Sequence, residues 1–245
     1  GVVADDITLV GTTRRAAAGC EYGGDKGIYA YGDDDTNKLD GSNLISNLGV
    51  VSDDVSGVGT ARNGLAACSY GTDKGIFGYG VSTGNVSLTN LVSNSGVIAT
   101  DTSGVGTARG YLAATEYGED KGIFAYGNPA TNVSNLVSSS GVVASDTTGV
   151  GTARLNLMAC DYGGDKGIFA FGNAASLTAV SNLVSNVGVV ATDTSGVGTA
   201  RYGGNATQYG GDKGIIAFGN DQTSAPGPYV SMSNLVSNAG VVASD

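Results

Sequence analysis

The sequence predicts an all-β fold, a five-bladed β-propeller with one four-stranded antiparallel sheet per repeat. Three observations predict it: one unit recurs five times, Gly-rich turns separate short β-type segments, and some strands are apolar on both faces. The tripeptide Asp-Lys-Gly recurs in steps of 48, 47, 45 and 47 residues. It begins at Asp25, Asp73, Asp120, Asp165 and Asp212. The motif Gly-Thr-Ala-Arg, with Thr for Ala in the first copy, recurs in the same steps. Insertions therefore fall outside the stretch between the two markers.

The second repeat shows the elements expected of each blade. Residues 62–70 predict a first strand, followed by a tight Gly-Thr-Asp turn and a second strand over 74–80. After a variable stretch, 88–94 predict a third strand and 97–102 a fourth, joined by the two-residue turn Ser95-Gly96. Antiparallel strands of this length with such turns are typical of one propeller blade.

Burial on both faces is the reason to prefer a propeller to a sandwich. In the second strand, Ile76 points to one face and Phe77 to the other, and the other repeats carry the same apolar pair. First strands hold small residues such as Ala66 and Ala67, which suit a crowded central axis. A solenoid of the same repeats is the alternative, but it requires atypical polar end repeats, which this chain lacks.

The fourth-strand segment occurs six times, whereas the other strands occur five times. We expect the N-terminal copy, Val2–Asp6, to pair into the last blade and close the ring, in competition with Val241–Asp245. A chain cut from a longer array is the alternative. On the first interpretation, residues 1–245 form a single closed propeller domain.

The repeat resembles a divergent kelch repeat. The resemblance rests on Thr-Ala-Arg-x-x-Leu-Ala-Ala, Lys-Gly-Ile-Phe-Ala-Tyr-Gly and Ser-Asn-Leu-Val-Ser-Asn-x-Gly-Val-Val-Ala-Ser-Asp, and covers all five copies. An aromatic-Gly pair such as Tyr79-Gly80 replaces the kelch double glycine, and the kelch Trp is missing. The resemblance implies four-stranded blades and an interaction module. Near-identical tandem units also resemble repeats in structural proteins of environmental phages, which implies a virion-surface or extracellular location.

Composition excludes several function classes. A net charge of −10 opposes binding to nucleic acid or to an anionic membrane surface, and no apolar run is long enough to insert into a bilayer. The chain has no His, which removes the commonest general base and metal ligand, and no Trp, which removes the best stacking platform. We expect no cofactor, no metal and a monomer.

Ten of the twelve cations occupy two repeated positions. One set is the marker arginines, Arg14, Arg62, Arg109, Arg154 and Arg201. These predict either a ring that holds an anionic ligand or, with more weight, structural bridges to the aspartates that end each fourth segment. A nest of backbone N–H groups in the Tyr-Gly-x-Asp-Lys-Gly turn is a second possible anion site, although such turns are usually structural.

Two other groups invite a chemical interpretation. Cys20, Cys68 and Cys160 lie on different blades, too far apart for a disulfide, and we expect reduced, buried thiols. Asp33, Asp35 and Asn37 are spaced faintly like a calcium loop, but Lys38 stands where an EF-hand needs Gly. A solvated acidic loop is the expectation there.

Antiparallel connectivity places the variable segments on one face. They are the five second-to-third loops, residues 33–40, 81–87, 128–133, 173–179 and 220–232, and the pairs that follow each marker arginine. We predict a ligand-binding surface here, with contacts from Tyr111, Tyr202, Tyr229, Asn63 and Asn156. The predicted function is a non-enzymatic binding or surface-structural module with a protein or glycan ligand. A lectin-like propeller is the alternative. The rival enzyme class is a glycosidase using two Asp carboxylates, for which Asp33 and Asp35 are the asymmetric candidates.

Overall fold

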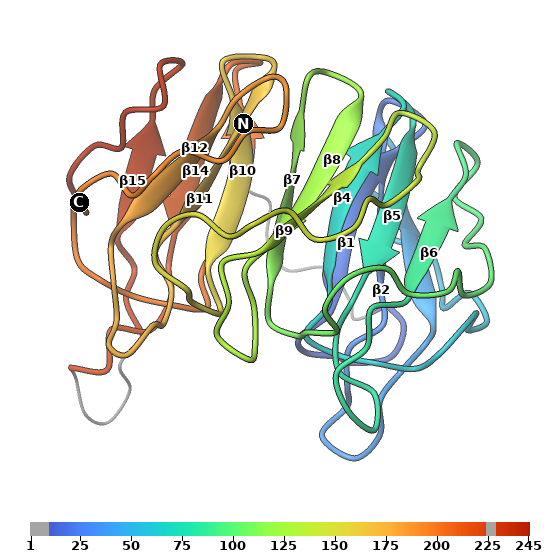
Figure 1. Cartoon of the computed structure of the whole chain (residues 1–245). Coiled ribbons are helices and arrows are strands. Elements are labelled where there is room, and N and C mark those ends of the chain that lie inside the picture. The colour runs from blue at the N-terminus through green and yellow to red at the C-terminus, as the bar shows by residue number, and fades with distance from the viewer. Residues whose placement is uncertain (1–9, 224–228) are drawn as a thin grey trace.

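The five repeats fold into five three-stranded antiparallel sheets in a propeller-like arrangement. The computed structural model describes residues 10–223 and 229–245. Figure 1 shows β10 to β15 on the left, β1 to β6 on the right and the third repeat between them. Each sheet has the order first-second-third strand and forms one blade, numbered here from the N-terminus. The strands are β1 (Ala18–Tyr22), β2 (Lys26–Ala30), β3 (Ser42–Ile45), β4 (Ala66–Tyr70), β5 (Lys74–Gly78), β6 (Thr89–Val92), β7 (Ala113–Tyr117), β8 (Lys121–Ala125), β9 (Ser134–Val137), β10 (Met158–Tyr162), β11 (Lys166–Ala170), β12 (Ser181–Val184), β13 (Asn205–Tyr209), β14 (Lys213–Ala217) and β15 (Ser233–Val236).

The first hairpin of each blade follows from its turn sequence. In blade 2, Tyr70 pairs with Lys74 across a three-residue loop. Gly71 and Thr72 in this loop have φ of 60° and 68°, the left-handed region in which glycine is least strained. A Cβ on Gly71 would also lie 2.8 Å from the carbonyl oxygen of Ser139 in the next blade. Glycine is therefore needed here for the turn and for the approach of the next blade.

The prediction that each blade has a fourth regular strand is wrong, because each sheet has three strands. The segment after β6 pairs with that strand only at two isolated bridges, Val92 with Ile98 and Thr89 with Thr102. Between these pairs the segment uses one more residue than β6, which is the signature of a bulge. The bulge turns the Asp101 carboxylate inward, where it accepts hydrogen bonds from the Asn90 side chain at 2.9 Å and the Thr60 hydroxyl at 2.7 Å. The regular pairing of the fourth segment with β6 is therefore interrupted at the residue whose carboxylate binds Asn90 and Thr60.

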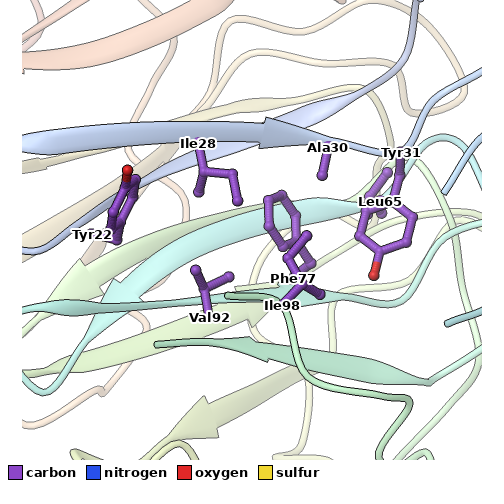
Figure 2. Packing of buried hydrophobic residues seen from close by; sticks show 8 residues of the cluster. All are labelled: Tyr22, Ile28, Ala30, Tyr31, Leu65, Phe77, Val92 and Ile98. Carbon is purple, nitrogen blue, oxygen red and sulfur yellow. The ribbon is translucent and has the colours of Figure 1, made fainter. Parts of the chain in front are cut away.

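The apolar core lies between neighbouring blades, as the two-faced second strands predict. Ile76 and Phe77 of β5 are both fully buried, on opposite faces. Figure 2 shows the cluster between blades 1 and 2, in which Phe77 lies between Val92 and the strand that carries Ile28 and Ala30. The ring of Phe77 also meets that of Tyr31 edge-on at 5.4 Å. Equivalent clusters join blades 2 and 3, 3 and 4, and 4 and 5.

The prediction of a closed ring is also wrong for the residues that the structure describes. No core cluster or backbone hydrogen bond among them joins blade 5 to blade 1. Phe218 of blade 5 is 61% exposed, whereas its equivalents in the other blades are fully buried. The place of the fourth segment in blade 5 belongs to the C-terminal copy, because Val242 bridges Val236 and Asp245 accepts the Thr199 N–H at 2.7 Å. The N-terminal copy, Val2–Asp6, lies outside the described residues.

Candidate functional site

A cavity of about 890 Å³ lies where the first strands of all five blades converge. Small side chains of these strands, such as Ala67, Ala114 and Ala159, leave the space open. Leu65, Leu112 and Leu157 line the end from which the first strands start. The acidic residues Glu21, Glu116 and Asp161 lie near the other end of these strands, next to the hairpin turns. The cavity thus has buried leucines at one end and acidic side chains near the other.

The acidic residues come from one position, seven residues after the marker arginine. The five repeats carry Glu21, Ser69, Glu116, Asp161 and Gln208 there. Glu119 of the third hairpin turn also lines the cavity, so that all three glutamates of the chain are in this one place. Sequence reasoning missed this site because the hairpin looks nearly invariant. The signal was present, since every other acidic residue in the chain is Asp.

Three of these carboxyl groups interact although their blades are not all adjacent. Burial raises the pKa of Glu116, and the negative charges of Asp161 and Glu21 raise it further, although a hydrogen bond from Ser69 opposes the change. Burial, then Asp161, raises the pKa of Glu21. Burial alone raises the pKa of Asp161. The three groups therefore line one cavity, in which Glu116 and Asp161 are half-buried, Glu21 is exposed, and the charge of Asp161 disfavours ionisation of Glu116 and Glu21.

Lys74 shares a smaller pocket beside the cavity with Glu21, Glu116 and Glu119. The lining of the cavity contains neither Lys nor Arg. The lysines beside the hairpin turns instead pair with the aspartate that precedes them, for example Lys74 with Asp73 at 2.6 Å. Cavity carboxylates take part in none of the ion pairs of residues 10–223 and 229–245. The lining of the cavity is therefore acidic and contains no basic side chain.

The marker arginines lie between blades. Arg62 is fully buried and donates to the Tyr79 carbonyl at 2.8 Å, the Thr60 carbonyl at 3.0 Å and Asn90 Oδ1 at 2.7 Å. Its nearest carboxylate oxygen, on Asp101, is 4.0 Å away. Arg109, Arg154 and Arg201 make the same three kinds of contact, and Arg14 donates to Asn43 and Asp54. These contacts favour the structural interpretation over an anion ring. Arg14, Arg62 and Arg201 lie within ion-pair distance of Asp54, Asp101 and Asp245, and in every blade an Asn side chain also accepts a hydrogen bond from the arginine.

The predicted variable face carries its candidate contacts on successive blades, linked by backbone hydrogen bonds from Gly64 through Tyr111 and Asn156 to Gly203. Tyr111 and Asn156 belong to a chain of backbone hydrogen bonds at the start of the first strands: Tyr111 N–H donates to Gly64 O at 2.6 Å and Asn156 N–H to Tyr111 O at 2.8 Å. Tyr202 and Tyr229 both pair with Asn220 on blade 5, and Tyr229 is 81% exposed. Asn63 lies on blade 2, where it donates to the Asp33 carboxylate at 2.5 Å.

The other chemical candidates have structural surroundings. Asp33, in the segment that faintly resembles a calcium loop, forms an ion pair with Arg15 at 2.8 Å and accepts a hydrogen bond from the Asn63 side chain. Protein groups therefore already occupy both oxygens of this carboxylate. All three cysteines are free. Burial raises the pKa of Cys20 and of Cys160 to about 12, which makes both thiols poor nucleophiles. Across the described chain, no group of three or more acidic or Cys side chains is arranged to hold a metal ion, and no helix is long and apolar enough to cross a bilayer.

No family model and no curated protein matches the chain. Among solved structures, that of YjhT is similar over 91% of this chain and 81% of its own, with 13% sequence identity and a TM-score of 0.67. Similarity at this level of identity concerns the fold alone. It agrees with a propeller-like array of repeated antiparallel sheets, and the kelch resemblance stays a prediction.

Proposed function

We propose that the chain is a non-enzymatic binding module whose ligand enters the axial cavity with a protonated amine directed at Glu21, Glu116 and Asp161. The observation that carries the proposal is that three carboxyl groups from different blades line one cavity whose lining contains no basic side chain. A ligand cation would offset these negative charges, since opposite charge favours the ionised form of each carboxyl group.

The repeat itself supports a functional origin for the carboxylates. A position that serves the fold is filled alike in every blade, as Arg62 and Asn90 and their equivalents are. The seventh position after the arginine instead carries Glu, Ser, Glu, Asp and Gln. Ser69 and Gln208 demonstrate that the blade does not require an acid there. Desolvated carboxyl groups that the fold does not need and that lower its stability are typical of binding sites.

Cavity size and polarity define the class of ligand. A volume of about 890 Å³ lies within the range of about 300–1,000 Å³ that is usual for small-molecule sites. Leu65, Leu112 and Leu157 at the end away from the acids are themselves buried, and the exposed lining is mainly polar. The preferred ligand is therefore an amine with a neutral body.

The test is a binding screen by thermal shift and calorimetry at pH 7. Primary and quaternary amines of increasing size are compared with neutral isosteres of the same shape. We expect amines to bind and isosteres not to bind, and Glu116→Gln and Asp161→Asn each to weaken amine binding at least tenfold. Asp53→Asn is the matched control, because it removes the same charge from an exposed side chain on a fourth segment. Equal binding by Asp161→Asn, Glu116→Gln and the control would reject the cavity as the site.

Carbohydrate binding on the variable face is the second candidate. It is favoured by Tyr229, whose exposed side chain stands beside Asn220 with Tyr202 on the other side. A glycan array with Tyr202→Ala and Tyr229→Ala separates this site from the cavity. An assay of aryl-glycoside hydrolysis on the same samples tests the rival enzyme class, which would use Glu116 as the acid, and turnover that Glu116→Gln abolishes would replace the binding proposal.

A further inference from the structure

We propose that the open sector between blade 5 and blade 1 is a docking site for one more blade of the same repeat. The argument begins with the four formed junctions, which share a set of contacts. At the hairpin turns, the N–H of Gly23 donates to Asp73 O of the next blade at 2.7 Å. After the second strand, the N–H of Gly32 donates to Arg62 O at 2.9 Å. Both bonds recur at each of the other three junctions.

Side chains at these junctions fit one another in the same regular way. A Cβ built on Gly75 of the next blade would lie only 2.5 Å from Cys20 Sγ. The thiol therefore fills the space that a side chain at Gly75 would need. Tyr22 and Leu44 together cover Gly96 of the next blade, with atoms 3.0 and 2.9 Å from the position of its Cβ. Equivalent residues make both contacts at the junctions of blades 2 to 5.

Blade 5 presents the first half of this junction with nothing against it in the described structure. Thr207, which corresponds to Cys20, is exposed. Tyr209 and Leu235, which correspond to Tyr22 and Leu44, are 39% and 48% exposed. The N–H groups of Gly210 and Gly219, which correspond to Gly23 and Gly32, have no acceptor among residues 10–223 and 229–245. Phe218 completes an apolar surface that the other blades bury.

Blade 1 presents the second half of the junction, namely the glycines and carbonyl groups that the preceding blade contacts at the other junctions. A Cβ on Gly49 would have no neighbour within 4 Å, whereas its equivalent Gly96 is covered by Tyr22 and Leu44. Gly27 has no side chain of another blade near it, whereas Gly75 is covered by Cys20. The carbonyl groups of Asp25 and Arg14 receive no hydrogen bond from the described chain, whereas those of Asp73 and Arg62 do. Each open face is thus the partner that the other lacks.

The occupant follows from the geometry of the two faces. Both belong to blades whose first strands line the same axial cavity, so they border one sector around one axis. A single blade carries both halves of the junction, as blades 2, 3 and 4 do, and can satisfy both faces at once. A second whole chain would bring one terminal blade into the sector, and its other four blades would overlap the first chain. The sequence also holds a sixth fourth-segment copy, Gly1–Asp6, although each of the five blades has its own.

The first test uses the whole chain and a polypeptide of residues 103–149, which comprises the third repeat with its marker arginine and fourth segment. Calorimetry and light scattering after gel filtration are expected to show a 1:1 complex and a raised Tm. Phe218→Asp should weaken binding at least tenfold. Val241→Asp is the matched control, because Val241 is 65% exposed on the same blade but outside the junction contacts. A chain that does not bind the polypeptide, or that forms a dimer abolished by Phe218→Asp, would overturn the proposal.

A second test does not depend on whether the isolated repeat stays soluble. The third repeat is fused to the N-terminus to give a six-repeat chain. Phe218→Asp should leave the Tm of the five-repeat chain unchanged and lower that of the six-repeat chain by several degrees, since only the latter buries Phe218. Equal losses in both chains would mean that blade 5 meets blade 1 directly. Amine binding by the five-repeat chain is measured in parallel, so failure of either proposal is seen separately.

Discussion

The guanidinium of Arg62 lies 4.1 Å from the centre of the Tyr31 ring, and the two residues belong to different blades. The same arginine is hydrogen-bonded within its own blade to Tyr79 O and Asn90. One side chain therefore completes the internal network of a blade and forms a stacking surface for the blade before it. The relationship recurs for Arg109 on Tyr79, Arg154 on Tyr126 and Arg201 on Phe171. Blade folding and blade packing are consequently coupled through one residue per repeat.

Arg62→Met is expected to destabilise the chain strongly. The substitution keeps an apolar stem but leaves Asn90 Oδ1 and the Tyr79 carbonyl buried without a donor. Loss of such a network costs about 3–5 kcal/mol. The difference in the free energy of unfolding between the variant and the wild type is measured by urea unfolding followed by circular dichroism. Arg15→Met is the control; the Arg15 side chain is 68% exposed, and its ion pair should contribute less than about 1 kcal/mol. Similar losses in the two variants would contradict the interpretation.

Asp101→Asn should reduce the acid sensitivity of stability. Burial acts to raise the pKa of Asp101, but hydrogen bonds from Thr60 and Asn90 outweigh it, so the net pKa lies below its usual 3.8. A carboxyl group with a lowered folded-state pKa stabilises the fold above pH 3.8, and this contribution disappears as the pH falls through the folded-state pKa. At pH 7 we expect a loss of about 1–3 kcal/mol, which becomes smaller below pH 3.8. Unfolding curves from pH 3 to 7 check this, and a constant difference would contradict it.

Glu116→Gln should have the opposite effect at neutral pH. Burial first, then Asp161 and Glu21, raise the pKa of Glu116 above its usual 4.5. The unfolded chain then releases this proton at lower pH than the folded chain, so wild-type stability falls as the pH rises from 4.5 through the folded-state pKa. The variant lacks this loss and should have the higher Tm at pH 7. Asp53→Asn serves as the control for charge alone, and a lower Tm for Glu116→Gln would disprove the proposed repulsion.

Two glycine substitutions compare a formed junction with an open one. A Cβ on Gly122 would lie 2.5 Å from Cys68 Sγ, so Gly122→Ala should cost about 1–3 kcal/mol, with partial rescue by Cys68→Ala. A Cβ on the equivalent Gly27 would meet only ordinary contacts at 3.5 Å or more, and Gly27→Ala should change stability by less than about 0.5 kcal/mol. Chemical denaturation of the three variants decides the point. A large loss for Gly27→Ala would show that blade 1 is covered.

The sequence predicted the parts of the fold that repeat. Two apolar faces on the Ile76-Phe77 strand and the Gly-rich hairpin at Gly71 are local patterns, and both are confirmed. Ring closure was not predictable in this way, because it depends on the angle between blades, to which every junction contributes and which no single motif encodes. The fourth strand was predicted as regular because the two-residue turn Ser95-Gly96 joins it to the third strand. The bulge before Asp101 becomes apparent only from its contacts with Thr60 and Asn90.

The site was harder to predict than the fold. The variation between repeats predicted ligand contacts at Tyr111, Asn156, Tyr202, Tyr229 and Asn63. In the structure these residues lie along one face. The cavity acids Glu21, Glu116 and Asp161 are single differences inside an otherwise constant hairpin. Their proximity arises from the convergence of first strands at the axis, where the position seven residues after each marker arginine meets its equivalents.

The backbone contacts between blades have an evolutionary consequence. The bonds from Gly23 to Asp73 and from Gly32 to Arg62 join main-chain atoms, and so they do not depend on which neighbour a blade has. Unequal recombination within the gene could therefore duplicate, delete or exchange whole repeats without a need for new contacts at the boundary. Such exchanges would change blade number and shuffle the Glu, Asp, Ser and Gln variants around the axis, with the same main-chain bonds at each junction.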